Sequence, residues 1–172
     1  MDMKAVESSP ISIVSLLGNA IIPSSIGMYN YKSIYQGGRD VDLYQSQKAL
    51  DNGKLALKEG GILIRVSECR SGIGEEAYFN LLASSKTPQE ALQRIEQGYK
   101  LGYHKAAKMA EIATRAEIWG VTGLAEQDME QAFIKPFHEV QEALDRAIER
   151  KGEKAKILFL MDANLTVPKL MR

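Results

Sequence analysis

Two kinds of hydrophobic pattern alternate along this 172-residue chain from residue 42 onward. The nearly continuous β-branched run at 62–66 and the segment at 156–161 are typical of buried parallel strands, which are covered on both faces. The segment 116–121 is short and partly β-branched, and it is also predicted to be a strand. Between them lie segments of about 10 to 15 residues with the apolar spacing of amphipathic helices. The alternation predicts an α/β fold, a mostly parallel, three-layer, Rossmann-like sheet with helices on both faces.

Local start and stop signals predict where the helices lie. Asp42 followed by Gln45 is a capping box for a first helix, which we expect Gly60-Gly61 to end through a left-handed C-cap. Thr87-Pro-Gln-Glu90 combines a capping threonine, a proline at the first helical position and a reciprocal glutamate. The remaining helices are predicted at 75–83, 103–114, 127–133 and 137–151.

Residues 1–36 differ from the rest of the chain. Ser, Pro, Gly and Tyr are frequent there, helical periodicity is missing, and only Ile11–Leu17 alternates like a strand. We therefore divide the chain into an irregular N-terminal extension, residues 1–36, and a domain over 37–172.

Composition and charge narrow the functional classes. The 22 basic and 22 acidic residues cancel, so no overall field recruits nucleic acid or an anionic membrane. The longest apolar stretch, 11–22, contains polar residues and is shorter than the roughly 20 residues of a spanning helix. Cys69 is the single cysteine, which excludes an internal disulfide and a multi-cysteine zinc site. We expect a cytoplasmic protein that binds neither nucleic acid nor membranes.

Polar and glycine-bearing segments follow the predicted strands. Because ligands of open α/β sheets bind at the carboxyl ends of the strands, residues 68–74, 122–123 and 162–164 are expected at one functional edge. Asp162 and Asn164 could offer polar groups to a ligand there, although such residues more often form turns.

Gly72-Ile-Gly74 matches, in form, the start of a Gly-x-Gly-x-x-Ala dinucleotide fingerprint. However, Glu75 and Glu76 would place two negative charges where the pyrophosphate has to lie. A plain strand-to-helix turn is the preferred interpretation, and a nucleotide-binding α/β protein is the alternative.

Gln45 and Lys48 stand three residues apart on a predicted helix and project from nearly the same face. An amide and an ammonium group that converge on one point suit a carboxylate ligand. The competing interpretation is that Gln45 only completes the capping box while Lys48 is solvated.

His104 and His138 are the two histidines, and they lie in no recognisable metal-binding motif. A structural role is the preferred interpretation for both. Cys69 follows a buried strand without an adjacent base, so it is not expected to act as a nucleophile. We therefore assign no catalytic and no metal-binding residue to this chain.

Several motifs in one order make residues 37–172 similar to the C-terminal domain of the nickel-pincer lactate racemase family. The motifs are Asp40-Val-Asp-Leu-Tyr-Gln-Ser-Gln-Lys48, Gly60-Gly-Ile-Leu-Ile64, Glu68-Cys-Arg-Ser-Gly-Ile-Gly74, Gly102-Tyr-His-Lys-Ala106 and Thr166-Val-Pro168.

The resemblance implies a domain that lines the cleft of a two-domain 2-hydroxyacid racemase. In that family, the metal-binding histidine, the cofactor lysine and the acid-base histidines belong to the N-terminal domain. The family's cleft-facing Gln and Lys correspond to Gln45 and Lys48. Further candidate residues at the cleft edge are Arg39, Asp42, Gly72, Gly74, Asp162 and Asn164.

The resemblance also implies that this chain alone holds no cofactor. A nickel-pincer nucleotide and a small hydroxy-carboxylate would bind when an N-terminal racemase domain, in cis or in trans, completes the cleft. Asp42 stands where the family has Asn, and its carboxylate would repel an anionic substrate unless Arg39 or Lys48 compensates. The alternative is a non-catalytic or regulatory module that binds a small carboxylate, and homo-oligomerisation stays open.

Overall fold

The computed structural model describes residues 11–17, 42–161 and 163–168, which form a five-stranded parallel sheet of order β4-β3-β2-β1-β5. The strands are β1 (Ile11–Leu17), β2 (Leu57–Val66), β3 (Glu117–Val121), β4 (Ile134–Phe137) and β5 (Ile157–Met161). The predicted parallel sheet is confirmed.

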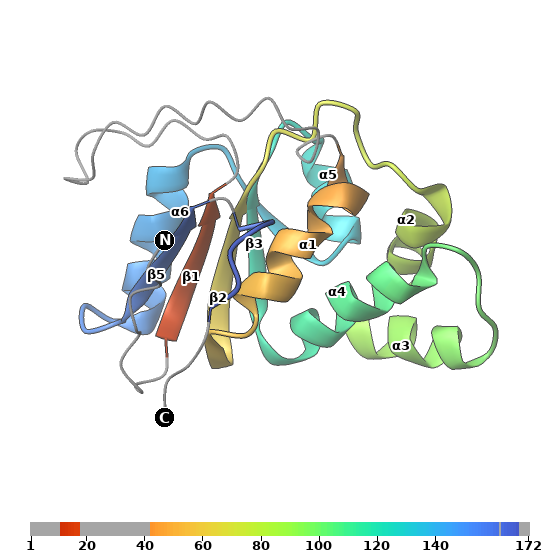
Figure 1. Ribbon diagram of the computed structural model, residues 1–172, viewed down its shortest axis with the longest axis horizontal. Helices are drawn as coiled ribbons and strands as arrows, with labels where there is room; N and C mark the ends of the chain where they lie inside the picture. The colour runs from red at the N-terminus through yellow and green to blue at the C-terminus, as the bar shows by residue number, and fades with distance from the viewer. Residues whose placement is uncertain (1–10, 18–41, 162, 169–172) are drawn as a thin grey trace.

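Helices cover both faces of this sheet, as predicted. They are α1 (Leu43–Gly53), α2 (Glu76–Ala83), α3 (Pro88–Glu96), α4 (Tyr103–Arg115), α5 (Glu126–Gln131) and α6 (Val140–Lys151). Figure 1 shows α1 and α4 on the near side of the strands and α6 behind them.

Successive side chains of β2 and of β3 enter two different cores. Leu63 and Ile118 pack with α1 to α5 in one hydrophobic cluster. Their neighbours Ile64 and Trp119 face α6 in a second cluster, together with Ala143, Leu144 and Ala147 of that helix. The molecule is therefore an α/β/α sandwich in which β2 and β3 are buried on both sides.

β1, which the sequence pattern assigns to the N-terminal extension, lies inside the sheet, between β2 and β5. Leu17 is in register with Val66 of β2 on one side and with Met161 of β5 on the other. The chain runs from β1 through β2 and β3 to β4 and then returns past β1 to form β5. The topological switch point, where ligands of such sheets gather, therefore lies at the carboxyl ends of β1 and β5.

Two predicted helix limits are wrong. The first helix ends at Gly53, and Gly60-Gly61 lie inside β2 instead of forming its C-cap. The register of the strands explains the glycines, because Ile11 pairs with Leu57 whereas Ile13 pairs with Ile62. β2 thus bulges against β1, and the positive φ of 67° at Gly60 fits such a bulge.

The last long helix begins at Val140 and not at Phe137. Phe137 ends β4, a four-residue edge strand that the sequence pattern did not reveal. Pro136 within it cannot donate a ladder hydrogen bond, and an edge strand is where a sheet tolerates that loss.

Candidate functional site

α1 and α4 lie side by side and enclose a polar pocket of about 590 Å³, here called the α1–α4 pocket. Both predicted ligand-facing residues, Gln45 and Lys48, line it, and both are exposed. The pocket also includes His104, Lys105 and Lys108 from α4 and Asn164 from the turn after β5.

Asp42 caps the N-terminal end of α1. Its Oδ1 accepts a hydrogen bond of 2.6 Å from the backbone N–H of Gln45, which confirms Asp42 as the N-cap residue. A carboxylate at a helix N-terminus is stabilised by the helix dipole. Asp42 does not line the α1–α4 pocket, so its carboxylate contacts the backbone of the helix and not a ligand bound there.

The loop after β2 occupies the other free N–H groups of α1. Leu43 N donates to Gly72 O at 3.0 Å, and Tyr44 N donates to Ile73 O at 3.1 Å. Gly72 and Gly74 adopt positive φ values of 78° and 87°, which allow this tight turn. The Gly-x-Gly segment therefore presents carbonyl groups to α1, and no free N–H group of the first turn is left for an anion there.

Lys105 reaches from α4 to the first turn of α1. Its Nζ donates a 2.8 Å hydrogen bond to Tyr44 O and lies 3.8 Å from the centroid of the Tyr44 ring. Burial lowers the pKa of Lys105, which the negative charges of Asp42 and Asp51 partly oppose. Lys105 belongs to the Gly102–Ala106 motif of the family resemblance, but no role is predicted for it from the sequence, because its contacts are with a backbone carbonyl and a ring far away in the chain.

The other lysines of the pocket differ in their ion pairs. Lys108 and Lys54 both pair with Asp51, at 2.8 and 3.3 Å. Within residues 42–161, Lys48 has no ion-pair partner within 4 Å. Its ammonium is thus available for an anionic ligand.

Two unpartnered amide groups add to the polarity of the pocket. Gln47 is 1% exposed, and its Nε2 has no hydrogen-bond partner in the described part of the chain; the same holds for Oδ1 of Asn164. Asn52 Nδ2 donates to Ala163 O at 2.7 Å and so brings the turn after β5 to α1. A ligand with both acceptor and donor groups would satisfy both amides.

A buried guanidinium lies on the other side of α1. Arg65 of β2 is 1% exposed, and its Nη2 donates to Oγ of Ser46 and, at 3.3 Å, to Oγ of Ser67. The same nitrogen lies 2.8 Å from Sγ of Cys69, which is buried at a positive φ of 53°. Through Ser46 this cluster contacts the buried side of α1, and it does not line the α1–α4 pocket.

The remaining described residues that the sequence singled out do not line the α1–α4 pocket. Gly123 N donates to Glu68 O at 3.0 Å, so the loops after β2 and β3 share one edge as predicted. His138 is exposed and lies 3.1 Å from a carboxylate oxygen of Glu126. Arg39 and Asp162 lie outside the described residues.

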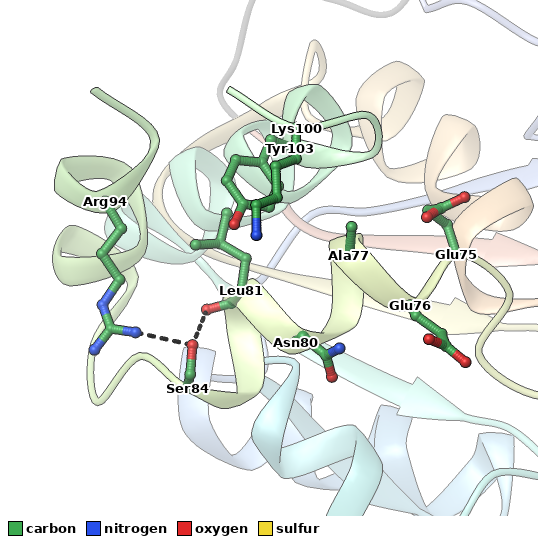
Figure 2. A pocket seen from close by; sticks show the side chains of 9 residues that line it. All are labelled: Glu75, Glu76, Ala77, Asn80, Leu81, Ser84, Arg94, Lys100 and Tyr103. Atoms are coloured by element: carbon green, nitrogen blue, oxygen red, sulfur yellow. Dashed lines mark hydrogen bonds between the residues drawn. The ribbon is translucent and has the colours of Figure 1, made fainter. Parts of the chain in front are cut away.

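A second pocket, of about 530 Å³, lies along α2 (Figure 2). At one end Arg94 donates to Ser84 Oγ at 2.9 Å and to a carboxylate oxygen of Glu90 at 2.6 Å. Glu75 and Glu76 lie at the other end. Since its arginine is engaged and its other end is acidic, this pocket suits a carboxylate less well than the α1–α4 pocket.

Among residues 11–17, 42–161 and 163–168, no group of three or more His, Cys, Asp or Glu side chains is placed to hold a metal ion. In the same ranges, no helix has the length and apolar character needed to cross a membrane. The α1–α4 pocket is lined mainly by ammonium and amide groups, beside the imidazole of His104 and the carboxylate of Asp51.

Comparison with known proteins gives matches to lactate racemases, both in sequence and in structure. Residues 35–167 match the family described as the lactate racemase C-terminal domain. The lactate racemase of Lactiplantibacillus plantarum is 27% identical over 128 residues, which cover 72% of this chain and 30% of that protein. The lactate racemase of Thermoanaerobacterium thermosaccharolyticum is 38% identical over 56 residues, which cover 33% and 13%.

A solved structure agrees with these sequence matches. The lactate racemase apoprotein from Thermoanaerobacterium thermosaccharolyticum superposes with a TM-score of 0.78 at 25% identity, covering 96% of this chain and 37% of that one. The chain thus spans well under half the length of the relatives it matches. On the match of residues 35–167, the chain belongs to the lactate racemase C-terminal domain family.

Proposed function

We propose that this chain supplies one wall of the active-site cleft of a 2-hydroxyacid racemase and that it binds the substrate carboxylate through Gln45 and Lys48. The observation that carries the proposal is that Lys48, whose ammonium has no ion-pair partner within residues 42–161, lies beside the exposed amide of Gln45 in the α1–α4 pocket. An ammonium group neutralises the carboxylate charge, and the amide N–H fixes its direction.

Racemisation of a 2-hydroxy acid also requires a base for the hydroxyl proton and a group that takes up the hydride. His104 is the one histidine that lines the pocket, so a pair of acid-base histidines has to come from elsewhere. We propose that an N-terminal racemase domain, in cis or in trans, provides them. The role of this chain is then to bind and orient the substrate.

The nickel-pincer nucleotide of the family is compatible with a chain that binds the substrate and a second domain that provides the acid-base histidines. The pocket offers mainly ammonium and amide donors, which suit the anionic part of a nucleotide, and its one imidazole, His104, belongs to no group of three metal-binding side chains among the described residues. When bound, the nucleotide would supply the hydride acceptor. Gln45 and Lys48 are the residues of this chain that we expect to face it.

The test is reconstitution of the chain with the cofactor-loaded N-terminal domain of a lactate racemase. Gln45→Ala and Lys48→Ala should each lower kcat/KM for the interconversion of D- and L-lactate by about tenfold to a hundredfold, since each removes a hydrogen bond to a charged group. Lys86→Ala, at an exposed lysine away from the pocket, serves as the control. Unchanged racemisation in both pocket variants would contradict the proposal.

A second candidate function rests on the fact that α1, α4 and the turn after β5 form the pocket without any other domain. The chain could therefore be a non-catalytic module that binds a small carboxylate. Calorimetric titration of the chain alone with lactate and with larger 2-hydroxy acids distinguishes the two. Tight binding without a partner domain, lost in Lys48→Ala, would favour the module.

A further inference from the structure

We propose that Lys105 is a positioning residue, whose ammonium holds the peptide unit between Tyr44 and Gln45 and thereby directs Gln45 and Lys48 into the α1–α4 pocket. The functional part of this inference rests on the function proposed above. The geometric part, that Lys105 orders the first turn of α1, can be tested independently of it.

The peptide unit between Tyr44 and Gln45 is held at both ends. Its N–H donates to Asp42 Oδ1 at 2.6 Å, and its carbonyl oxygen accepts from Lys105 Nζ at 2.8 Å. In α-helical geometry the same oxygen also accepts from the N–H of Lys48, four residues further on. One oxygen atom thus joins Lys105 to the backbone of both proposed ligand-binding residues.

The ring of Tyr44 is fixed by the same lysine. Lys105 Nζ lies 3.8 Å from the ring centroid, which is cation–π geometry. Tyr78 and His104 approach the ring edge-on, with centroid distances of 5.6 and 6.4 Å. Side chain and carbonyl of Tyr44 are therefore both tied to α4, so this residue cannot move without breaking several contacts.

The partners of Lys105 distinguish it from its neighbour Lys108. Lys108, one turn further along α4, pairs with the carboxylate of Asp51. In residues 42–161 no carboxylate lies within 4 Å of Lys105, although its side chain is partly buried. An ammonium group placed there without an ionic partner acts on the carbonyl and the ring, and thus on the geometry of α1.

The rest of α1 is secured by other contacts. Leu43 and Leu50 are fully buried, and Arg115 Nη2 donates to Lys54 O at 3.2 Å beyond the C-terminal end of the helix. Loss of the Lys105 contact should therefore loosen the first turn locally and leave the fold intact.

Amide hydrogen exchange of the purified chain, followed by NMR, tests the geometric part. Lys105→Met keeps the aliphatic stem but removes the donor, and it should raise the exchange rate of the Lys48 amide by about tenfold or more. Lys105→Arg should restore most of the protection. Lys108→Met is the matched control and should leave the rate near that of the wild type. An unchanged rate in Lys105→Met, or an equal rise in Lys108→Met, would overturn the proposal.

Kinetics of the reconstituted racemase test the functional part. Lys105→Met should raise KM for lactate by about tenfold, with recovery in Lys105→Arg, since misdirected donors weaken substrate binding. A wild-type KM in Lys105→Met despite faster exchange would show that the ordering of α1 does not serve substrate binding. Failure of the proposed function itself is seen separately, as full activity in Gln45→Ala and Lys48→Ala.

Discussion

The carboxylate of Asp42 lies in the space that a side chain at Gly74 would need, since a Cβ there would come within 2.7 Å of Asp42 Cγ. Asp42 is at the same time the N-cap of α1. The glycine after β2 and the cap of α1 are therefore interdependent, although they lie far apart in the sequence.

This contact predicts that Gly74→Ala lowers the free energy of unfolding by more than backbone strain alone would. Gly74 and Gly60 both have positive φ, which costs an alanine about 1–2 kcal/mol. Space around Gly60 is open, whereas Gly74 meets Asp42. We expect Gly74→Ala to lower the free energy of unfolding by at least about 1 kcal/mol more than Gly60→Ala in urea denaturation. Equal losses would show that Asp42 moves aside freely.

Replacing Asp42 separates its hydrogen bond from its charge. Asp42→Ala removes the acceptor for Gln45 N and should cost about 0.5–2 kcal/mol. Asp42→Asn keeps an acceptor oxygen and should cost only the charge–dipole part, about 0.3–1 kcal/mol. Thermal unfolding of the two variants at low and high salt is the measurement. A larger loss in Asp42→Asn than in Asp42→Ala would contradict the capping role.

Tyr78 should make the protein sensitive to alkaline pH. Its side chain is fully buried, its hydroxyl oxygen has no partner in the described part of the chain, and burial raises the pKa of Tyr78 above 10. Because the pKa is higher in the folded state, the contribution of Tyr78 to stability is complete below about pH 10 and is lost as the pH rises further.

Tyr78→Phe should therefore flatten the loss of stability above pH 10. At pH 7 it should change the free energy of unfolding by less than about 1 kcal/mol, since it removes an unsatisfied hydroxyl. Tyr99→Phe, at a tyrosine that is 64% exposed, is the control and should keep the wild-type pH profile. Denaturation curves between pH 7 and pH 11 test this, and a parallel profile for Tyr78→Phe would contradict it.

Trp119 and Phe137 should be energetically coupled. Their rings stack at a centroid distance of 4.8 Å, and Trp119 is 1% exposed. A double-mutant cycle with Trp119→Leu and Phe137→Leu should give a coupling energy of about 0.5–1.5 kcal/mol. Circular dichroism is the suitable probe, because the variant lacks the single tryptophan. Additive losses would mean that the two rings stabilise the sheet independently.

Local signals predicted the helices well where the sequence itself contains the cap. Thr87 Oγ1 accepts from Glu90 N at 3.2 Å and Pro88 opens α3, as the motif indicated. β4 was missed because four residues that include a proline carry almost no strand signal. The end of α1 was misplaced because Leu55 and Leu57 continue a helical spacing beyond Gly53.

The candidate site could be predicted only as far as it lies on one helix. The spacing of Gln45 and Lys48 was sufficient to place both on one face, since three residues make nearly one turn. Lys105 lies on another helix, 61 residues after the carbonyl that it contacts. Side-chain patterns do not report contacts to backbone carbonyls, so the motif at 102–106 contains this lysine, but only the packing of α4 against α1 reveals what it contacts.

The position of β1 between β2 and β5 affects any attempt to produce this domain separately. Similarity to the family begins at residue 35, after β1 has ended. A fragment that starts there would lack the strand between β2 and β5, which do not pair with each other. β2 would then expose an unpaired edge of backbone N–H and C=O groups, and the edge strand β5 would lose the strand that it pairs with, β1. Unpaired strand edges promote association with other chains. A soluble fragment therefore has to include residues 11–17, or another chain has to insert a strand in their place.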